Sequence, residues 1–112
     1  MVASPQVCTM PELSRADFFT TMGAFPTGVT IVTTLDEDGN PRGLTCNAFS
    51  SVSVEPPMLL VCLDRRSTTL ESVHQTGRFV VNFLAAERGA ISDRFAGKHP
   101  DKFWDIRWQE AG

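Results

Sequence analysis

Residues 27–40, TGVTIVTTLDEDGN, hold a run of β-branched side chains that ends in an acidic turn. β-Branched residues favour a strand, and Asp-Gly is one of the strongest signals for the tight turn of a hairpin. We therefore predict a strand over residues 27–35, a hairpin loop over residues 36–40 and a return strand over residues 42–48.

Further strands are predicted on the C-terminal side of this hairpin. Residues 50–54 are interpreted as a third, hairpin-connected strand that ends before Pro56-Pro57. Residues 58–63 (MLLVCL) and 78–84 (RFVVNFL) are short continuous apolar runs, which are typical of strands buried on both faces. The pattern predicts about five strands, the first three of them joined by hairpins.

Three short helices are expected between the strands. Ser14 has an N-cap position with Asp17 three residues on, and the phenylalanines that follow predict an amphipathic helix packed on the core. A second helix is predicted from a cap at Thr68 to a stop at Gly77, and a third over residues 87–95 with a stop at Gly97. Mostly antiparallel strands with inserted helices fit a small β-barrel better than a stack of βαβ units.

The composition excludes several classes of protein. At 112 residues with 42% apolar side chains, the chain fits one globular domain, with residues 1–13 as an N-terminal arm and residues 14–112 as the domain. The net charge is −3 and no run of Lys or Arg exceeds Arg65-Arg66, so nucleic-acid binding is not expected. The longest apolar run, residues 58–63, is far too short to span a bilayer, so no membrane association is expected.

The three cysteines, Cys8, Cys46 and Cys62, are widely spaced and form no CxxC pair. The chain has only two histidines, so no metal-binding cluster is expected. Cys46 and Cys62 lie within apolar strand patterns and are predicted to be buried structural thiols rather than nucleophiles. Free thiols are typical of a reducing compartment, so a cytoplasmic location is expected.

Catalysis by side chains alone is poorly supported. The sequence has no Gly-x-Gly, Gly-x-Ser-x-Gly or HExxH motif, the common fingerprints of dinucleotide-binding folds, serine hydrolases and zinc hydrolases. We assign no catalytic residue. Any chemistry would have to come from a bound cofactor.

Three stretches are candidates for holding such a cofactor. Residues 45–53 (TCNAFSSVS) carry small polar side chains that would let a planar heterocycle approach the backbone, and an ordinary polar edge strand explains them equally well. Residues 64–69 (DRRSTT) place two arginines before a helix N-terminus, which attracts anions, although alone they fit a solvated turn better. In residues 26–29 (PTGV), Gly28 permits close backbone approach, and simple turn chemistry is an equal explanation.

Together these stretches resemble the short-chain flavin reductase family, the small reductase components of two-component flavin-dependent monooxygenases. The motifs, in family order, are residues 22–30 (MGAFPTGVT), 43–53 (GLTCNAFSSVS), 63–67 (LDRRS), 77–82 (GRFVVN) and 92–103 (SDRFAGKHPDKF). The resemblance implies a split β-barrel that binds FMN or FAD, as a homodimer. It also implies that NADH or NADPH passes a hydride to flavin N5, and that the reduced flavin serves a partner monooxygenase.

The same resemblance, carried over motif by motif, implies a set of flavin-binding residues. The residues bordering the flavin ring would be Thr27, Gly28 and Val29. The residues meeting the ring and the ribityl chain would be Thr45, Cys46, Asn47 and Ser51. The residues toward the ribityl and phosphate end would be Asp64, Arg65, Ser67 and Thr68. The residues closing the pocket would be Phe95 and Lys102.

The chain departs from the family pattern at its C-terminal end. The family continues with further strands that carry a Gly-Asp-His-type segment near the nicotinamide, and no such segment occurs here. We therefore expect a split barrel truncated at the C-terminus. A flavin-binding module or redox carrier without its own NAD(P)H-oxidising activity is the alternative to a reductase. A purely structural domain that has lost the flavin is a third possibility, against which the retained small polar residues argue.

Overall fold

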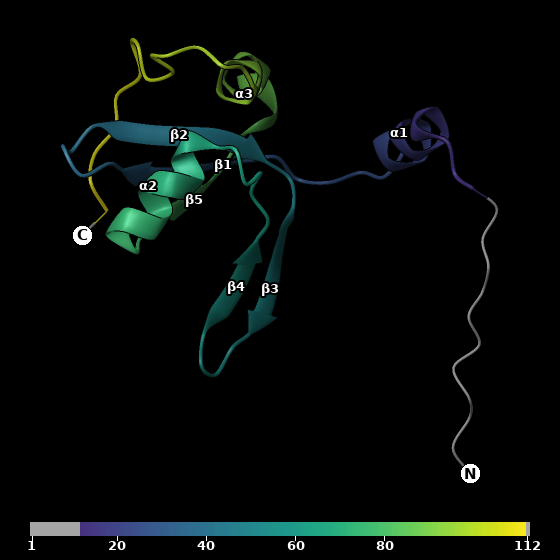
Figure 1. The fold of residues 1–112 in the computed structure, drawn as a ribbon, viewed down its shortest axis with the longest axis horizontal. Coiled ribbons are helices and arrows are strands. Elements are labelled where there is room, and N and C mark those ends of the chain that lie inside the picture. The colour runs from purple at the N-terminus through teal and green to yellow at the C-terminus, as the bar shows by residue number, and fades with distance from the viewer. Residues whose placement is uncertain (1–11, 112) are drawn as a thin grey trace.

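A computed structural model describes residues 12–111, so most of the predicted arm over residues 1–13 lies outside it. In this part of the chain five strands form two sheets, as Figure 1 shows. The larger sheet has the order β2-β1-β5 and consists of β1 (Thr30–Leu35), β2 (Pro41–Cys46) and β5 (Val80–Phe83). The smaller pairs β3 (Phe49–Ser53) with β4 (Met58–Val61). The chain is mainly β, as predicted, but over residues 12–111 the two sheets share no strand and form no closed barrel.

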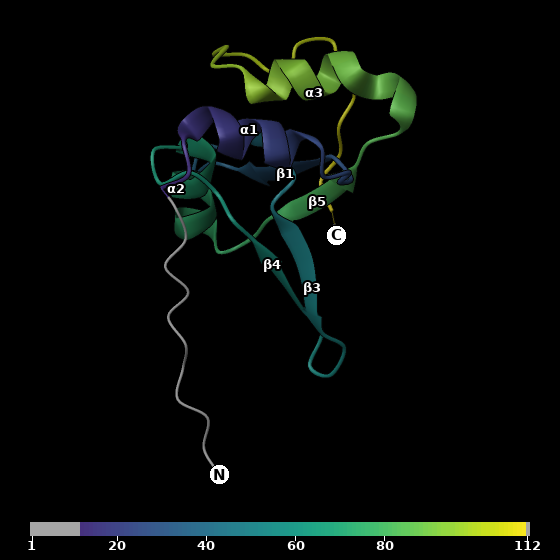
Figure 2. The same cartoon turned by 90° about the vertical axis from the view of Figure 1, so that its right-hand side faces the viewer.

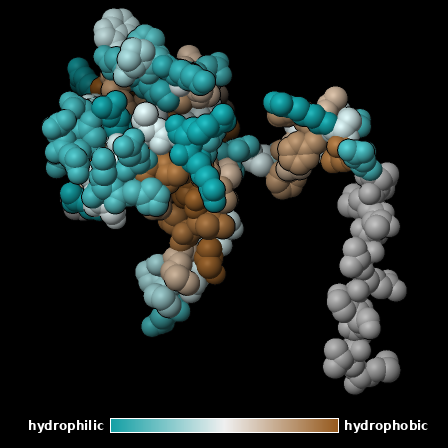
Figure 3. All heavy atoms as spheres, viewed as in Figure 1, coloured by the Kyte–Doolittle hydropathy of each residue, from teal (hydrophilic) through white to brown (hydrophobic). Residues whose placement is uncertain are grey.

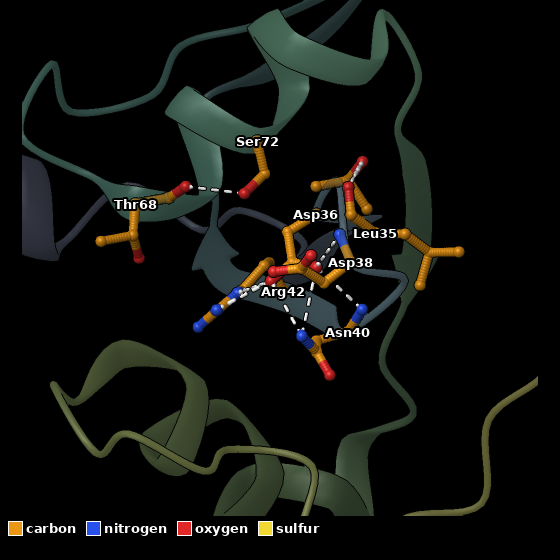
Figure 4. Close-up of polar contacts among 8 residues, drawn as sticks. Leu35, Asp36, Asp38, Asn40, Arg42, Thr68 and Ser72 are labelled. Carbon is orange, nitrogen blue, oxygen red and sulfur yellow. Dashed lines mark hydrogen bonds and ion pairs between the residues drawn. The ribbon is translucent and has the colours of Figure 1, made fainter.

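The predicted hairpin between β1 and β2 is confirmed. Gly39 has a φ of 81°, a left-handed conformation that glycine adopts without strain. The Asp36 carboxylate accepts hydrogen bonds from the backbone N–H groups of Asp38 and Asn40, at 3.0 and 2.9 Å, and pairs with Arg42 at 2.8 Å (Figure 4). These bonds, above all the one from the Asn40 N–H, hold the pKa of Asp36 below its usual value.

The core lies around β1, the central strand of the larger sheet. Its antiparallel register places Thr30 opposite both Cys46 of β2 and Phe83 of β5. Ile31 and Val32 point to opposite faces of the sheet and both are buried. Both faces of β1 are therefore covered.

Two threonines of β1 are also buried, and each is hydrogen-bonded. Thr30 Oγ1 donates to the backbone oxygen of Cys46 at 2.6 Å. Thr34 Oγ1 donates to the backbone oxygen of Arg78 at 2.7 Å and lies 3.2 Å from Thr76 Oγ1. Over the described part of the chain, no buried side-chain nitrogen or oxygen lacks a partner, so these hydroxyls carry no desolvation penalty from a missing bond.

Helices α2 (Thr68–Thr76) and α3 (Gly89–Ala96) cover opposite faces of the larger sheet. Thr34 meets Thr76 of α2, whereas the hydroxyl of Thr45 donates to the backbone oxygen of Ser92 in α3 at 2.5 Å. The strand register and the alternation of side chains put Thr34 and Thr45 on different faces. The sheet is therefore the middle of three layers.

The N-cap of helix α2 lies one residue earlier than predicted. The cap is Ser67 rather than Thr68, because Ser67 Oγ accepts a hydrogen bond from the N–H of Thr69 at 3.2 Å. Within the helix, Ser72 Oγ donates to the backbone oxygen of Thr68 at 3.1 Å, as Figure 4 shows. Gly77 ends the helix with a φ of 67°, which confirms the predicted glycine stop.

The α3 face of the sheet is closed by an aromatic cluster over Gly43. Phe95 is 2% exposed and lies so close that a Cβ built on Gly43 would be 2.8 Å from its Cε1. Phe103 packs edge-to-face on Phe95 with ring centroids 4.9 Å apart, and Trp108 packs on Phe103 at 6.4 Å. These contacts hold the C-terminal segment to the sheet. No strand forms over residues 98–111.

The third predicted helix is observed in two parts. A 3₁₀ turn, η1 (Ala86–Arg88), precedes α3, which therefore begins at Gly89 rather than near residue 87. The N–H of Gly97 reaches back to the carbonyl oxygens of Asp93 and Arg94, both at 3.2 Å, so the predicted stop at Gly97 is confirmed.

The β3–β4 hairpin projects away from the larger sheet in both views (Figures 1 and 2). β3 pairs with β4 and not with β2, so the prediction of three consecutive hairpin-connected strands is wrong. Met58, Leu59 and Leu60 of β4 are about half exposed. The predicted burial of residues 58–63 on both faces is therefore wrong, because within residues 12–111 no layer packs over this hairpin. Residues 78–84 are likewise not buried on both faces, since Phe83 is 72% exposed.

Helix α1 (Arg15–Gly23) stands apart from both sheets (Figure 1). Its predicted cap is confirmed, since Ser14 Oγ accepts a hydrogen bond from the N–H of Asp17 at 3.1 Å. Its phenylalanines are about half exposed, and it has no buried residue, so the predicted packing of this helix on the core is wrong. Figure 3 shows its apolar side chains on the surface, as it does those of the projecting hairpin. Neither α1 nor any other helix of the described chain is long and apolar enough to cross a membrane.

Candidate functional site

Three of the predicted stretches meet at one end of the larger sheet, which we call the site edge. Residues 27–29 lead into β1, residues 46–48 leave β2, and residues 62–64 leave β4. The pairing of Thr30 with Cys46 places the start of β1 beside the end of β2. The antiparallel register therefore brings together two stretches that the sequence separates.

Backbone hydrogen bonds join the remaining segments to the site edge. The N–H of Cys62 donates to the carbonyl oxygen of Ala48 at 3.0 Å, which brings in the chain after β4. The N–H of Leu84 donates to the carbonyl oxygen of Val29 at 3.2 Å, which brings in the chain after β5. The site edge is thus built from the ends of four segments, which main-chain hydrogen bonds join.

The two cysteines of the described chain lie together at the site edge. Cys46 is 6% exposed, and its Sγ lies 3.6 Å from the carbonyl oxygen of Cys62 and 3.8 Å from that of Ala48. Its predicted role as a buried thiol is confirmed. Cys62 is exposed, so the same prediction for Cys62 is wrong, because β4 has no covering layer on its outer side.

Polar groups at the site edge differ in their availability to a ligand. The Thr45 hydroxyl is occupied by the backbone of Ser92 on the α3 side. Asn47 is exposed, and its side chain makes no hydrogen bond to any residue that the structure describes. A Cβ built on Gly28 would meet no atom within 4 Å, so the space beside this glycine is open. Asn47 and the backbone near Gly28 are therefore the parts of the predicted ring site that can receive a ligand.

The loop before α2 contains two arginines with different surroundings. Arg66 pairs with Asp64 at 3.2 Å, and Arg66 also donates its backbone N–H to the Asp64 carboxylate at 2.9 Å. The Arg66 side chain holds the pKa of Asp64 below its usual value, and Asp64 raises the pKa of Arg66 in turn. Arg65 is exposed and makes no ion pair or hydrogen bond within residues 12–111. Arg65, rather than Arg66, is thus available to an anion.

An open hollow of about 670 Å³ lies beside this loop and along the outer side of α2. Its lining residues are Arg65, Arg66, Ser67, Thr68, Leu70, Glu71, His74 and Gln75. The first N–H groups of α2 and the helix dipole favour an anion at this end of the hollow. His74 is exposed on the helix.

Three of the predicted site residues lie away from the site edge. Phe95 is in the aromatic cluster of the α3 face. Lys102 Nζ donates to the carbonyl oxygens of Gly43 and Phe95, at 3.2 and 2.9 Å, and burial lowers the pKa of this lysine. Ser51 is exposed on the projecting hairpin, where it pairs with Leu59. Phe95 and Lys102 therefore lie with Thr45 on the α3 face of the sheet, and Ser51 lies apart from them on the hairpin.

One aromatic pair at this end of the sheet was missed in the sequence. Phe49 and Phe83 pack edge-to-face with ring centroids 5.6 Å apart. Phe83 lies opposite Thr30 in the register, and most of its ring is exposed. Only the non-local pairing of β1 with β5 reveals this position, although Phe83 directly follows the 77–82 motif. No group of three or more His, Cys, Asp or Glu side chains able to hold a metal occurs in the described range.

Over residues 12–111 the chain is a mainly β domain whose open sheet end lies beside the N-terminus of α2. Residues 22–112 match the family model described as "Flavin reductase like domain". The chain belongs to this family, which confirms the resemblance found in the sequence.

Relatives give the same result. The chain is 51% identical over 100 residues to a flavin reductase (NADH) of Kitasatospora aureofaciens, covering 88% of this chain and 52% of the relative. It is 42% identical over 100 residues to a flavin reductase (NADPH) of Lentzea aerocolonigenes, covering 89% and 58%. The crystal structure of a homologue of nitrilotriacetate monooxygenase component B from Mycobacterium thermoresistibile superposes with a TM-score of 0.81 at 39% identity, covering 87% and 54%. The chain thus spans about half the length of the curated relatives that it matches.

Proposed function

We propose that this chain is a flavin reductase, or the flavin-binding part of one, which binds FMN or FAD at the site edge and uses NADH or NADPH as the electron donor. The observation that carries the proposal is the convergence of residues 27–29, 46–48 and 62–64 beside the N-terminus of α2. When bound, the flavin supplies the chemistry by accepting a hydride at N5. The protein residues bind and orient it.

The groups at the site edge fit the two ends of a flavin. The open space beside Gly28 and the unpaired Asn47 amide suit a planar ring with a polar edge. Arg65, the Thr68 hydroxyl and the first N–H groups of α2 suit the phosphate. Thr27 and Val29 border the ring in this proposal. Cys46 contributes its backbone, because its thiol is buried.

Most of the other predicted residues stabilise the structure around this site rather than contact the flavin. We assign Thr45, Phe95 and Lys102 to holding β2 against α3, since their polar or aromatic groups are already engaged there. Ser67 caps α2, and Asp64 orders the loop through Arg66. Ser51 remains a proposed ligand that the projecting hairpin would carry to the flavin.

We further propose a homodimer that passes reduced flavin to a flavin-dependent monooxygenase, in the cytoplasm. The apolar side chains exposed on β4 and α1 are the kind of surface that a second copy covers. The solved relative is a monooxygenase component, which supports the proposed oxygenase partner. The free thiols Cys46 and Cys62 support a reducing compartment. A completed split barrel is the architecture we propose for the assembled protein.

An anaerobic absorbance titration tests the proposal. The chain is titrated with FMN and with FAD, and NADH or NADPH is then added. Saturable binding followed by bleaching near ~450 nm supports a reductase. Binding without bleaching supports the flavin-binding module instead. A folded chain that binds neither flavin contradicts both.

Two variants test the assigned residues. Arg65→Ala removes a charge-assisted bond to phosphate worth about 1.5–3 kcal/mol, which is roughly a ten- to hundredfold loss of FMN affinity. Asn47→Leu removes the amide at the ring. Arg66→Ala is the matched control, since its guanidinium already pairs with Asp64. Unchanged FMN affinity in both Arg65→Ala and Asn47→Leu would contradict the assigned site.

A further inference from the structure

We propose that Cys46 and Cys62 form a reversible disulfide when the protein meets hydrogen peroxide, and that this bridge lowers the affinity of the site edge for flavin. The formation of the bridge rests on the geometry of the two cysteines alone. Its effect on flavin rests on the proposed function.

The two cysteines are already in contact. Cys46 Sγ lies 3.6 Å from the carbonyl oxygen of Cys62, and the N–H of Cys62 is fixed to the carbonyl oxygen of Ala48 at 3.0 Å. A disulfide joins residues whose Cα atoms are about 4.4–6.8 Å apart. Cys46 Sγ thus lies against the backbone of Cys62, and the bridge requires the exposed Cys62 side chain to turn toward it.

The two thiols differ in their access to solvent. Cys62 is exposed at the end of β4, whereas Cys46 is 6% exposed beneath the turn that follows β2. A dissolved oxidant therefore meets Cys62 first. Cys46 is shielded from dissolved oxidants, so only a neighbouring group of the protein, such as the Cys62 sulfur, can react with it. An exposed reacting thiol beside a buried second thiol is the arrangement that captures an oxidised sulfur before it is oxidised further.

The reaction balances with peroxide as the two-electron oxidant. The Cys62 sulfur attacks one peroxide oxygen, the O–O bond breaks, and the products are a sulfenic acid at Cys62 and one water. The Cys46 sulfur then attacks the Cys62 sulfur, the S–O bond breaks, and a second water leaves with the Cys46 proton. Two thiols and one peroxide thus yield one disulfide and two waters. A dithiol reductant reverses the reaction.

The bridge would change the site edge directly. It ties residues 46–48, which include the exposed Asn47, to residues 62–64. Turning the Cys62 side chain inward draws the start of the 64–67 loop toward the end of β2. Reduced flavin reacts with dioxygen to give peroxide, so excess reduced flavin would close the site that produces it. The junction between β2 and β4 would therefore have two states, one with free thiols and one with the disulfide.

The bridge is tested in a Cys8→Ser background, which leaves only the two cysteines in question. After treatment with peroxide, trypsin releases both on one peptide, residues 43–65, whose mass falls by about 2 Da if the bridge forms. Subsequent cleavage after Phe49 leaves the two halves linked until dithiothreitol is added. We expect both results. A persistent sulfenic acid at Cys62, or a Cys62–Cys62 link between two chains, would overturn the proposal.

Matched variants separate the two thiols. With Cys46→Ala in the same background, Cys62 is expected to stop at the sulfenic acid, which dimedone traps. With Cys62→Ser, Cys46 is expected to remain a free thiol. Dimedone labelling of Cys46 in Cys62→Ser would show that the buried thiol reacts first and would overturn the assigned order.

The effect on flavin is read separately, from FMN titration of the reduced and the oxidised Cys8→Ser protein. We expect an affinity about tenfold lower after oxidation, restored by dithiothreitol, and no such change in Cys62→Ser. Equal affinity of the bridged and reduced forms would overturn the regulatory effect while leaving the bridge established. A reduced protein that does not bind FMN counts against the proposed function, and the peptide masses still decide the bridge.

Discussion

The two hairpins of this chain differ in what they bury. One buries polar side chains, and the other exposes apolar side chains. The β1–β2 hairpin is rich in threonine, yet Thr30 and Thr34 are buried with their hydroxyls paired. The β3–β4 hairpin carries the longest apolar run of the sequence, yet Met58 and Leu60 are half exposed. Burial therefore follows from what packs on a strand, and α2 and α3 pack on the first hairpin.

Because of this difference, we expect the first hairpin to contribute to the stability of the fold and the second to association with another surface. Apolar area removed from water contributes roughly 25 cal/mol per Å², and within the described chain that area is concentrated between the larger sheet and its two helices. The side chains exposed on β3–β4 contribute to the free energy of association with whatever covers them. Four variants break or sharpen the comparison, from the largest expected loss of stability to the smallest.

Removal of the Phe95 ring is expected to cost the most. Phe95→Ala empties the centre of the α3 face, and such a change typically costs about 3–5 kcal/mol of unfolding free energy. Val54→Ala, on the projecting hairpin at a side chain 92% exposed, is the control and is expected to change it by less than about 0.5 kcal/mol. Urea unfolding of the two variants measures both. Equal losses of unfolding free energy in the two variants would contradict the inference that stability resides in the larger sheet and its helices rather than in the projecting hairpin.

A methyl group at Gly43 tests the same face by overpacking. The Cβ of Gly43→Ala would lie 2.8 Å from Phe95 Cε1 and 3.2 Å from Thr33 Cγ2, which we expect to cost about 1–3 kcal/mol. Gly89→Ala, where the new Cβ meets nothing within 4 Å, is the control. Combining Gly43→Ala with Phe95→Leu should restore part of the loss in a double-mutant cycle. Additive losses would show that the two residues do not share this space.

The turn of the buried hairpin should make stability depend on pH. The folded protein holds the pKa of Asp36 below 3.8, so the stabilisation by its carboxylate is fully present above that value. It is lost as the pH falls through the lowered pKa. Asp36→Asn keeps one oxygen acceptor but does not titrate there. Melting temperatures between pH 6 and pH 2 should therefore fall more steeply for the natural protein than for Asp36→Asn, and parallel curves would contradict this role.

A charge on the exposed hairpin is expected to change stability least and association most. Leu60→Glu places a carboxylate on a half-exposed apolar position, so the unfolding free energy of the single chain should change by less than about 0.5 kcal/mol. If a second copy covers this hairpin, the same variant should be monomeric by light scattering. Thr33→Glu, on the buried hairpin, is the counterpart and should unfold the chain instead. A dimer retained in Leu60→Glu would contradict our assignment of the dimer surface.

Local signals in the sequence predicted the fold well where one short segment decides the outcome. The turn at Gly39, the cap at Ser14 and the stops at Gly77 and Gly97 depend on a few neighbouring residues. The existence of all five strands was also predictable from β-branched and apolar runs. Such features need no knowledge of the rest of the chain.

Features that depend on packing partners were not predictable. The apolar run of β4 is consistent with burial, and only the three-dimensional arrangement shows that no layer covers it. The same holds for α1, whose spacing of phenylalanines is typical of a packed helix. For the candidate site, the stretches were predicted from the sequence, but which of them lie side by side was not. The register of β1 places residues 27–29 and 46–48 together, whereas Phe95 and Lys102 are held on the α3 face by contacts with Gly43.

The position of β1 between β2 and β5 also sets an order of folding. Thr30 finds Cys46 through a short loop but finds Phe83 only after a much longer one, and the entropy of closing a loop rises with its length. We therefore expect the β1–β2 hairpin to form first and β5 to dock late. Because the end of β5 is bonded to Val29, a nascent chain on the ribosome would expose an incomplete site edge until β5 has left the exit tunnel. At the site that we propose, flavin would then bind only after β5 has docked beside β1.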